Sequence, residues 1–161
     1  MAHHKLFVAW LNDAYASENA IVETLEKQVD AAADFPEIQS GIQRHLEASQ
    51  GHAETVKGCL ESLGESPSVV KTGMAEVGGK LQGMMQGMAQ DKLVKAALQD
   101  YATEHMEIAS YKALIVAADD LGHPEIAEKC RTILQDEEAM AAWLDQQLPM
   151  VVRATLSQAH A

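Results

Sequence analysis

The chain has 161 residues, which suits one domain spanning residues 1–161 and leaves no room for a second full one. Its formal net charge of −12 argues against nucleic acid and against anionic membrane surfaces as partners, because both are bound through clustered Lys and Arg. Aromatic residues make up only 4% of the chain and Pro occurs four times, a composition that favours helices over sheets.

Neither a transmembrane helix nor a signal peptide is expected. The N-terminal apolar patch, residues 6–11, is cut short by Asn12 and Asp13. The two cysteines, Cys59 and Cys130, form no CxxC motif and are interpreted as small core residues in a reducing compartment. These features predict a cytoplasmic protein.

Hydrophobic periodicity predicts four long amphipathic helices, over residues 5–33, 36–63, 91–121 and 124–147. Short turns at Phe35-Pro36 and at Gly122 join the first helix to the second and the third to the fourth, so each pair should form an antiparallel hairpin. Pro149 is expected to open a short C-terminal helix or tail. The predicted fold is an all-α antiparallel four-helix bundle.

The segment between Gly64 and Asp91 would be a long crossover between the two hairpins. It is rich in Gly and Met, with Gly79, Gly83 and Gly87 spaced by four residues. A weak helix packed on the bundle, a close-packed dimer face and a Met site for a soft metal are all open for it. This segment and an apolar content of 47% predict a homodimer.

Each predicted helix carries polar residues on its apolar stripe. The first stripe contains Glu18, and the second contains His45, Ser49 and His52. On the third, Glu104 is followed one turn later by Glu107, and the fourth contains Glu137 with Asp136 at its edge. Every helix therefore directs at least one potential metal ligand inward.

The turns give the depth of these residues along the bundle. Glu18 lies 17 residues before Phe35 and His52 lies 17 after it, while Glu107 and Glu137 are each 15 residues from Gly122. Each pair should therefore share a level. His45 should lie ~10 Å from His52 along the helix axis and is not expected to reach the site.

Acidic groups at one depth can be buried together when a cation compensates their charge. The set predicted to bind metal is Glu18, His52, Glu104, Glu107, Asp136 and Glu137. The alternative for any one Glu is a structural hydrogen bond. Tyr101 and Tyr111 are interpreted as core residues, with contact to a ligand carboxylate as the second option.

Four strings resemble the YciE/YciF group of ferritin-like bacterial stress proteins, with the YciE branch closer. They are LNDAYASENAIVETL, HLEASQGH, EHMEIASYKAL and LQDEEAMAAWL, and the resemblance covers nearly the whole chain. It implies a ferritin-like bundle, a dimer and a di-iron type of site. By position it assigns ligands to Glu18, to Glu104 and Glu107, and to Asp136 and Glu137.

The chain departs from that pattern at two places. Ala48 and Ser49 stand where the family's second helix supplies a carboxylate, and Met140 stands where a His is expected. These losses put a full dinuclear oxidase centre in doubt but leave one metal ion plausible. Two hypotheses follow: a protein that binds iron or manganese, mono- or dinuclear, and oxidises Fe(II) with dioxygen or peroxide under stress, or a degenerate bundle that serves as a homo-oligomeric interaction module.

Overall fold

The structure, a computed structural model, describes residues 2–68 and 91–159. It contains four helices: α1 (Ala2–Ala31), α2 (Pro36–Ser62), α4 (Lys92–Asp120) and α5 (Pro124–Ala159). In these two ranges the chain forms no strand, which confirms the all-α prediction. The predicted crossover falls mainly on residues 69–90, so the hypotheses about its Gly and Met residues lie outside the described residues.

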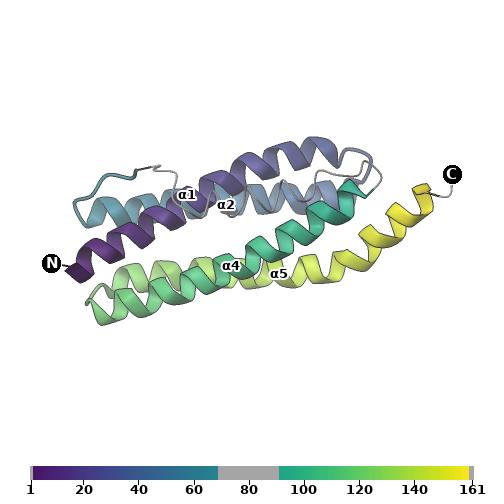
Figure 1. Ribbon diagram of the computed structural model, residues 1–161. Helices are drawn as coiled ribbons and strands as arrows, with labels where there is room; N and C mark the ends of the chain where they lie inside the picture. Colours follow the sequence, from purple (N-terminus) through teal and green to yellow (C-terminus); the bar gives the residue numbers. More distant parts are fainter. Residues whose placement is uncertain (1, 69–90, 160–161) are drawn as a thin grey trace.

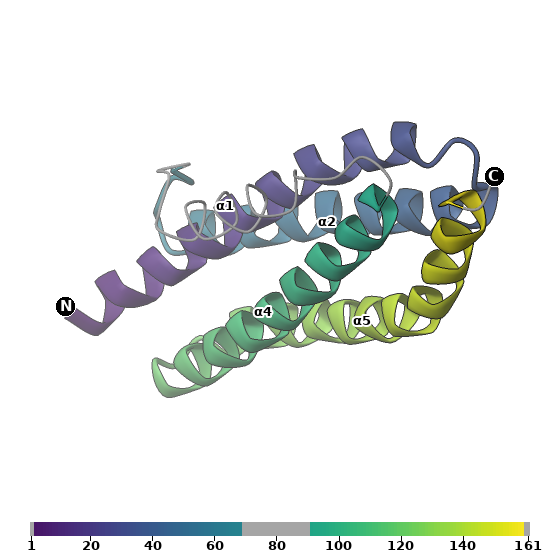
Figure 2. The ribbon, with the colours of Figure 1, turned by 45° about the vertical axis from the view of Figure 1, so that its right-hand side comes forward.

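The four helices form an elongated bundle built from two antiparallel hairpins, α1 with α2 and α4 with α5 (Figure 1). The hairpins face each other, with α1 beside α4 and α2 beside α5. Figure 2 shows that α1 begins and α5 ends at opposite ends of the bundle. None of the described helices is long and apolar enough to cross a membrane.

Glycine and proline set the ends of the helices as the sequence predicted. Gly64 and Gly122 have positive φ angles of 77° and 78°, a conformation that costs Gly least, and both follow the end of a helix. The turn after α4 closes with a 2.8 Å hydrogen bond from the His123 N–H to the carbonyl of Ala118. Pro36 and Pro124 each stand at the first position of a helix, where a missing N–H costs nothing.

The prediction of a separate C-terminal helix was wrong, because α5 runs continuously from Pro124 to Ala159 with Pro149 inside it. Proline removes one hydrogen bond and crowds the preceding turn, which bends a helix without always ending it. Pro149 is exposed, so water can hydrate the freed carbonyl, and α5 changes direction near its C-terminal end (Figure 2). Val151, just beyond it, is buried against Ala32 and Ile38 and holds the extension on the bundle.

The main apolar core fills the end of the bundle that contains the Gly122 turn. Its fully buried side chains include Phe7, Leu11, Val56, Leu60, Leu114 and Ile133. Cys59 and Cys130 are 1% exposed and belong to this core, as predicted. Two smaller apolar clusters lie toward the Phe35 turn, around Leu25 and around Ala32. Polar side chains occupy the stretch between the main core and these clusters.

Candidate metal centre

Seven polar residues of the described helices are buried inside the bundle, although isolated charges are costly there. They are Glu18, His45, Ser49, His52, Glu104, Glu107 and Glu137. Six lie on the stripes that helical periodicity predicted to face inward, Glu107 lies beside the third stripe, and all four helices contribute. The helices thus bring together side chains separated by more than 100 residues of chain.

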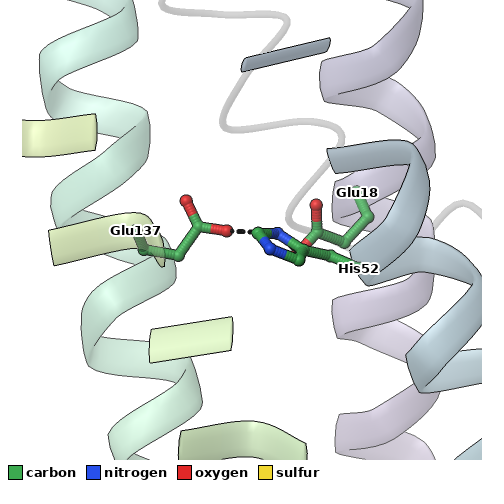
Figure 3. A group of neighbouring side chains, drawn as sticks. All are labelled: Glu18, His52 and Glu137. Atoms are coloured by element: carbon green, nitrogen blue, oxygen red, sulfur yellow. Dashed lines mark ion pairs between the residues drawn. The ribbon is translucent and has the colours of Figure 1, made fainter. Parts of the chain in front are cut away.

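Glu18, His52 and Glu137 form the first group (Figure 3). One atom from each lies within 4.8 Å of the other two. Nδ1 of His52 is 2.8 Å from Oε1 of Glu137 and 3.6 Å from Oε1 of Glu18. The figure shows the Glu137 carboxylate directed across the bundle at the imidazole ring. The predicted shared level of Glu18 and His52 is therefore confirmed.

A second group consists of His45, Glu104 and Glu137, whose ligand atoms also lie within 4.8 Å of one another. Nε2 of His45 is 2.8 Å from Oε1 of Glu104. Glu137 belongs to both groups and therefore joins them. Its carboxylate has two oxygens, the number that a carboxylate needs to contact two cations.

The prediction that His45 lies too far away was wrong. Its separation of seven residues from His52 does place the two backbones ~10 Å apart along α2. However, α4 runs in the same direction as α2, from the Phe35 end of the bundle to the Gly122 end. Glu104, one turn before Glu107, therefore lies toward the Phe35 end, as His45 does. The cluster extends over more than one turn, and the long side chain of Glu137 spans the interval.

Glu107 belongs to neither of these two groups. It is 3% exposed, and neither of its carboxylate oxygens has a hydrogen-bond partner among the described residues. Burial, and then the charges of Glu18 and Glu137, raise the pKa of Glu107 well above its usual value. The carboxyl group therefore lies within electrostatic reach of the first group and retains a proton when no cation is bound.

Asp136 and Tyr111 make contacts on the outer side of the cluster. Asp136 has a half-exposed side chain, and Oδ2 lies 3.0 Å from Nε2 of His52, on the ring edge opposite Glu137. The Tyr111 hydroxyl donates a 2.6 Å hydrogen bond to Oε1 of Glu18, the carboxylate contact that was the second option for this residue. Both contacts fix the orientation of groups that face inward. The Tyr101 ring instead packs against His105, with ring centroids 4.6 Å apart and ring planes tilted by 57°.

Without a cation, the cluster must hold protons. Burial, and then the charge of Glu137, raise the pKa of Glu18 to about 8. Burial and the contact with Glu137 raise the pKa of Glu104 to about 10. Burial alone would lower the pKa of His52, but its contacts with Glu137 and Glu18 outweigh this and raise it to about 9. Burial also lowers the pKa of His45. Protons therefore neutralise these carboxyl groups near pH 7.

Many inward atoms lack a hydrogen bond among the described residues. They are Oε2 of Glu18, Nε2 of His45, Oγ of Ser49, Nδ1 of His52, both oxygens of Glu104 and Glu107, and Oε1 of Glu137. Several approach one another at 2.8 Å without hydrogen-bond geometry, as expected when lone pairs converge on a common point. Two ligand atoms that bind the same ion, each at ~2.1 Å, lie ~3–4 Å apart. The residues present thus fit a hard or intermediate divalent cation.

The two departures from the expected pattern are visible at the cluster. Ser49 is fully buried between His45 and His52 on α2 and offers a hydroxyl instead of a carboxylate. Met140 is half-buried one turn after Glu137 on α5, and a thioether is a poor ligand for iron or manganese. The second group obtains its imidazole from His45 on α2 instead. The His lost at position 140 therefore does not leave that group without nitrogen.

Comparison with solved structures identifies the fold. A protein from Xanthomonas campestris is 33% identical, with 99% of each chain covered and a TM-score of 0.83. The bacterioferritin of Desulfovibrio desulfuricans, a protein with a diiron site, matches over 94% of this chain and 83% of its own with a TM-score of 0.77 and 18% identity. The four helices therefore have the ferritin-like fold.

Among curated proteins, YciF of Escherichia coli K12 is 26% identical over 140 residues, which are 83% of this chain and 82% of YciF. The crystal structure of the E. coli stress protein YciF superposes over 94% of this chain and 97% of its own, with a TM-score of 0.82 and 22% identity. The model of DUF892, a domain of unknown function, matches residues 2–157. The chain belongs to the DUF892 family and is similar to YciF within it.

Proposed function

We propose that this protein binds divalent metal ions in the buried cluster at the centre of its bundle. The observation that carries the proposal is the convergence of four glutamates and two histidines, with most of their inward atoms lacking hydrogen bonds among the described residues. Unpaired buried carboxyl groups destabilise a fold unless a cation binds between them. A structural role alone does not account for so many unsatisfied groups.

The groups suggest two adjacent ion sites that share Glu137. Glu18 and His52 would complete the first, and Glu104 and His45 the second. Glu107 would join the first site or hold a water molecule beside it. Asp136 would act through His52, since a carboxylate on the far ring nitrogen orients the imidazole and increases its basicity. His45 thus replaces Asp136 in the predicted set of ligands.

Iron is the proposed metal, with manganese second, because carboxylates and imidazoles suit both. The chemistry that bound iron would supply is the oxidation of Fe(II) to Fe(III) by dioxygen or peroxide. The likeness to a stress protein supports a role in stress response, and the motifs favour the YciE branch. The protein would exclude water from the bound ions. Tyr111 would hold Glu18 in position, and Asp136 would hold His52.

The metal content of protein purified without chelator tests this proposal. Elemental analysis should find iron or manganese bound to the chain. Stripped protein should then show a higher melting temperature when Fe(II) or Mn(II) is added without oxygen, since a ligand that binds only the native state stabilises it. A protein that is metal-free when purified and shows no thermal shift with either ion would refute the proposal.

A second candidate is a metal-free bundle that acts as an interaction module. Ser49 favours it, because a buried hydroxyl stands where a carboxylate is expected. The two candidates differ in stability: a protein adapted to lack metal should be equally stable with and without chelator. The same thermal-shift experiment separates them.

A homodimer is proposed with either function. Leu6, Trp10 and Val116 are large apolar residues at least 45% exposed, on the adjacent helices α1 and α4. Burying such a face in a dimer would stabilise it. Analytical ultracentrifugation should give twice the chain mass, and a monomer at high micromolar concentration would contradict the proposal.

A further inference from the structure

A cavity of about 230 Å³ lies between α1 and α4. The two helices lie side by side in Figures 1 and 2 and belong to different hairpins. The polar part of its wall comes from Asp13 and Ser17 of α1 and from Glu107, Ser110 and Tyr111 of α4. Trp10, which is 45% exposed, also lines it.

The wall connects the surface with the cluster. Asp13 and Ser17 are half-buried, whereas Glu107 is 3% exposed and has two oxygens without a partner in the described part of the chain. Tyr111 lines the same cavity and donates its hydroxyl hydrogen to Glu18 of the first group. Glu107 thus lines the cavity, and the neighbouring Tyr111 joins the same wall to Glu18 of the first group.

We infer that this cavity is the route by which a divalent cation reaches the buried centre, with Glu107 as the carboxylate that receives it. The inference rests on the proposed metal-binding function and adds to it a path and a role for Glu107. Asp13 would attract the hydrated ion at the outer end. Ser17 and Ser110 would replace part of its water shell before Glu107 binds it.

Charge favours a cation over an anionic occupant. Two of the described residues that line the cavity, Asp13 and Glu107, carry carboxyl groups, and none of them is Lys or Arg. The chain's net charge of −12 raises the local concentration of cations further. Hydroxyl and carboxylate oxygens are the donors that Mn(II) and Fe(II) accept with little selectivity, as a transit path requires.

The test compares rates of binding with equilibrium occupancy. Mn(II) is mixed with the stripped full-length protein, and the free ion is followed by its electron paramagnetic resonance signal, at early times and after equilibration. Ser110→Leu should fill the cavity and slow Mn(II) uptake by about tenfold or more, since a path that needs a conformational opening binds slowly. Release into excess chelator should slow by the same factor, because a barrier on the path leaves the affinity unchanged.

Ala109→Leu is the matched control, because Ala109 is the exposed neighbour of Ser110 on α4 and does not line the cavity. It should bind Mn(II) at the wild-type rate. Asp13→Asn should slow uptake and reduce its dependence on salt, since steering by charge is screened by salt. Circular dichroism of each variant checks that it is folded. Should Ser110→Leu fail to fold, Ser17→Leu blocks the opposite wall and is judged by the same two rates.

The outcomes separate the two proposals. Wild-type protein that binds no Mn(II) at equilibrium refutes the metal centre itself. Wild-type binding with equal uptake rates in the folded blocking variants and Ala109→Leu refutes the route and leaves the centre intact. Unchanged Mn(II) uptake with slower oxidation of bound Fe(II) would assign the cavity to the oxidant and overturn the inference.

Discussion

The Gly122 end and the middle of the bundle use the same four helices to bury opposite kinds of side chain. At the Gly122 end, Phe7, Leu60 and Leu114 are at most 2% exposed and belong to one apolar cluster. About three turns further along α1 and α4, Glu18 and Glu104 are buried just as completely, as is Glu137 on α5. The first region stabilises the fold by excluding water and the second destabilises it unless protons or cations neutralise it. The apolar end therefore stabilises the fold, whereas the polar middle contains the candidate metal centre.

The largest expected effect is in the apolar end. Phe7→Ala should lower the free energy of unfolding by about 3–5 kcal/mol, because it removes a fully buried ring and leaves a cavity. The loss, measured by urea denaturation, should be the same with and without Mn(II), since Phe7 is not part of the cluster. A loss that depends on Mn(II) would show that the two regions are energetically coupled.

Glu137→Gln should have the next largest effect, because Glu137 belongs to both groups. The variant should retain its helical content by circular dichroism but lose most of its metal by elemental analysis. The stabilisation by metal, ~2.7 kcal/mol at a free ion concentration of 100 Kd, should disappear with it. Glu138→Gln is the control, since Glu138 is exposed and pairs with Lys112 on the surface. Equal metal loss in both variants would place the site elsewhere.

His45→Gln tests the revised second group. The residue counts predicted little effect on metal occupancy, whereas the contact with Glu104 predicts loss of the ion bound there and retention of the one at His52. Titration with Mn(II) followed by calorimetry should therefore show one class of sites missing. If the variant binds Mn(II) as the wild type does, His45 is not a metal ligand, although it lies beside Glu104.

A change of a single pH unit should have the smallest effect. Because the pKa of Glu18 rises from 4.5 to about 8 on folding, this group keeps a proton in the native state that it loses in the unfolded state above about pH 5. The metal-free protein should therefore lose stability as pH rises from 5 to 8, by at most ~1.4 kcal/mol per pH unit for each such proton.

Other groups of the cluster also shape that curve, Glu104 and Glu107 in the same direction as Glu18 because burial raises the pKa of each. The stabilisation from His52, with a pKa raised from 6.5 to about 9, is complete below pH 6.5 and is lost as pH rises through 9, the same direction as Glu18. Glu137 has a lowered pKa, so its contribution is lost on the acid side. Melting temperatures at pH 5.5 and 8 test the slope. Saturating Mn(II) should reverse it, since metal competes with protons for the same atoms.

The sequence predicted the helices and their inward faces well, because periodicity, Gly and Pro act locally. Gly122 needs its positive φ whatever surrounds it, and each of the seven buried polar residues lies on or directly beside a predicted stripe. The two errors, at Pro149 and His45, depend on tertiary packing. Pro149 is tolerated because Val151 packs beyond it, and His45 contacts Glu104 because another hairpin brings that carboxylate to its level. No pattern within one helix contains that information.

The buried thiols at the apolar end also provide a way to time the opening of the molecule. Burial and the neighbouring Cys59 raise the pKa of Cys130 to about 12, so the native protein presents almost no thiolate to a modifying reagent. Both cysteines should react only in molecules whose core has opened. The labelling rate in native buffer would then measure how often α2 and α5 separate, without any denaturant.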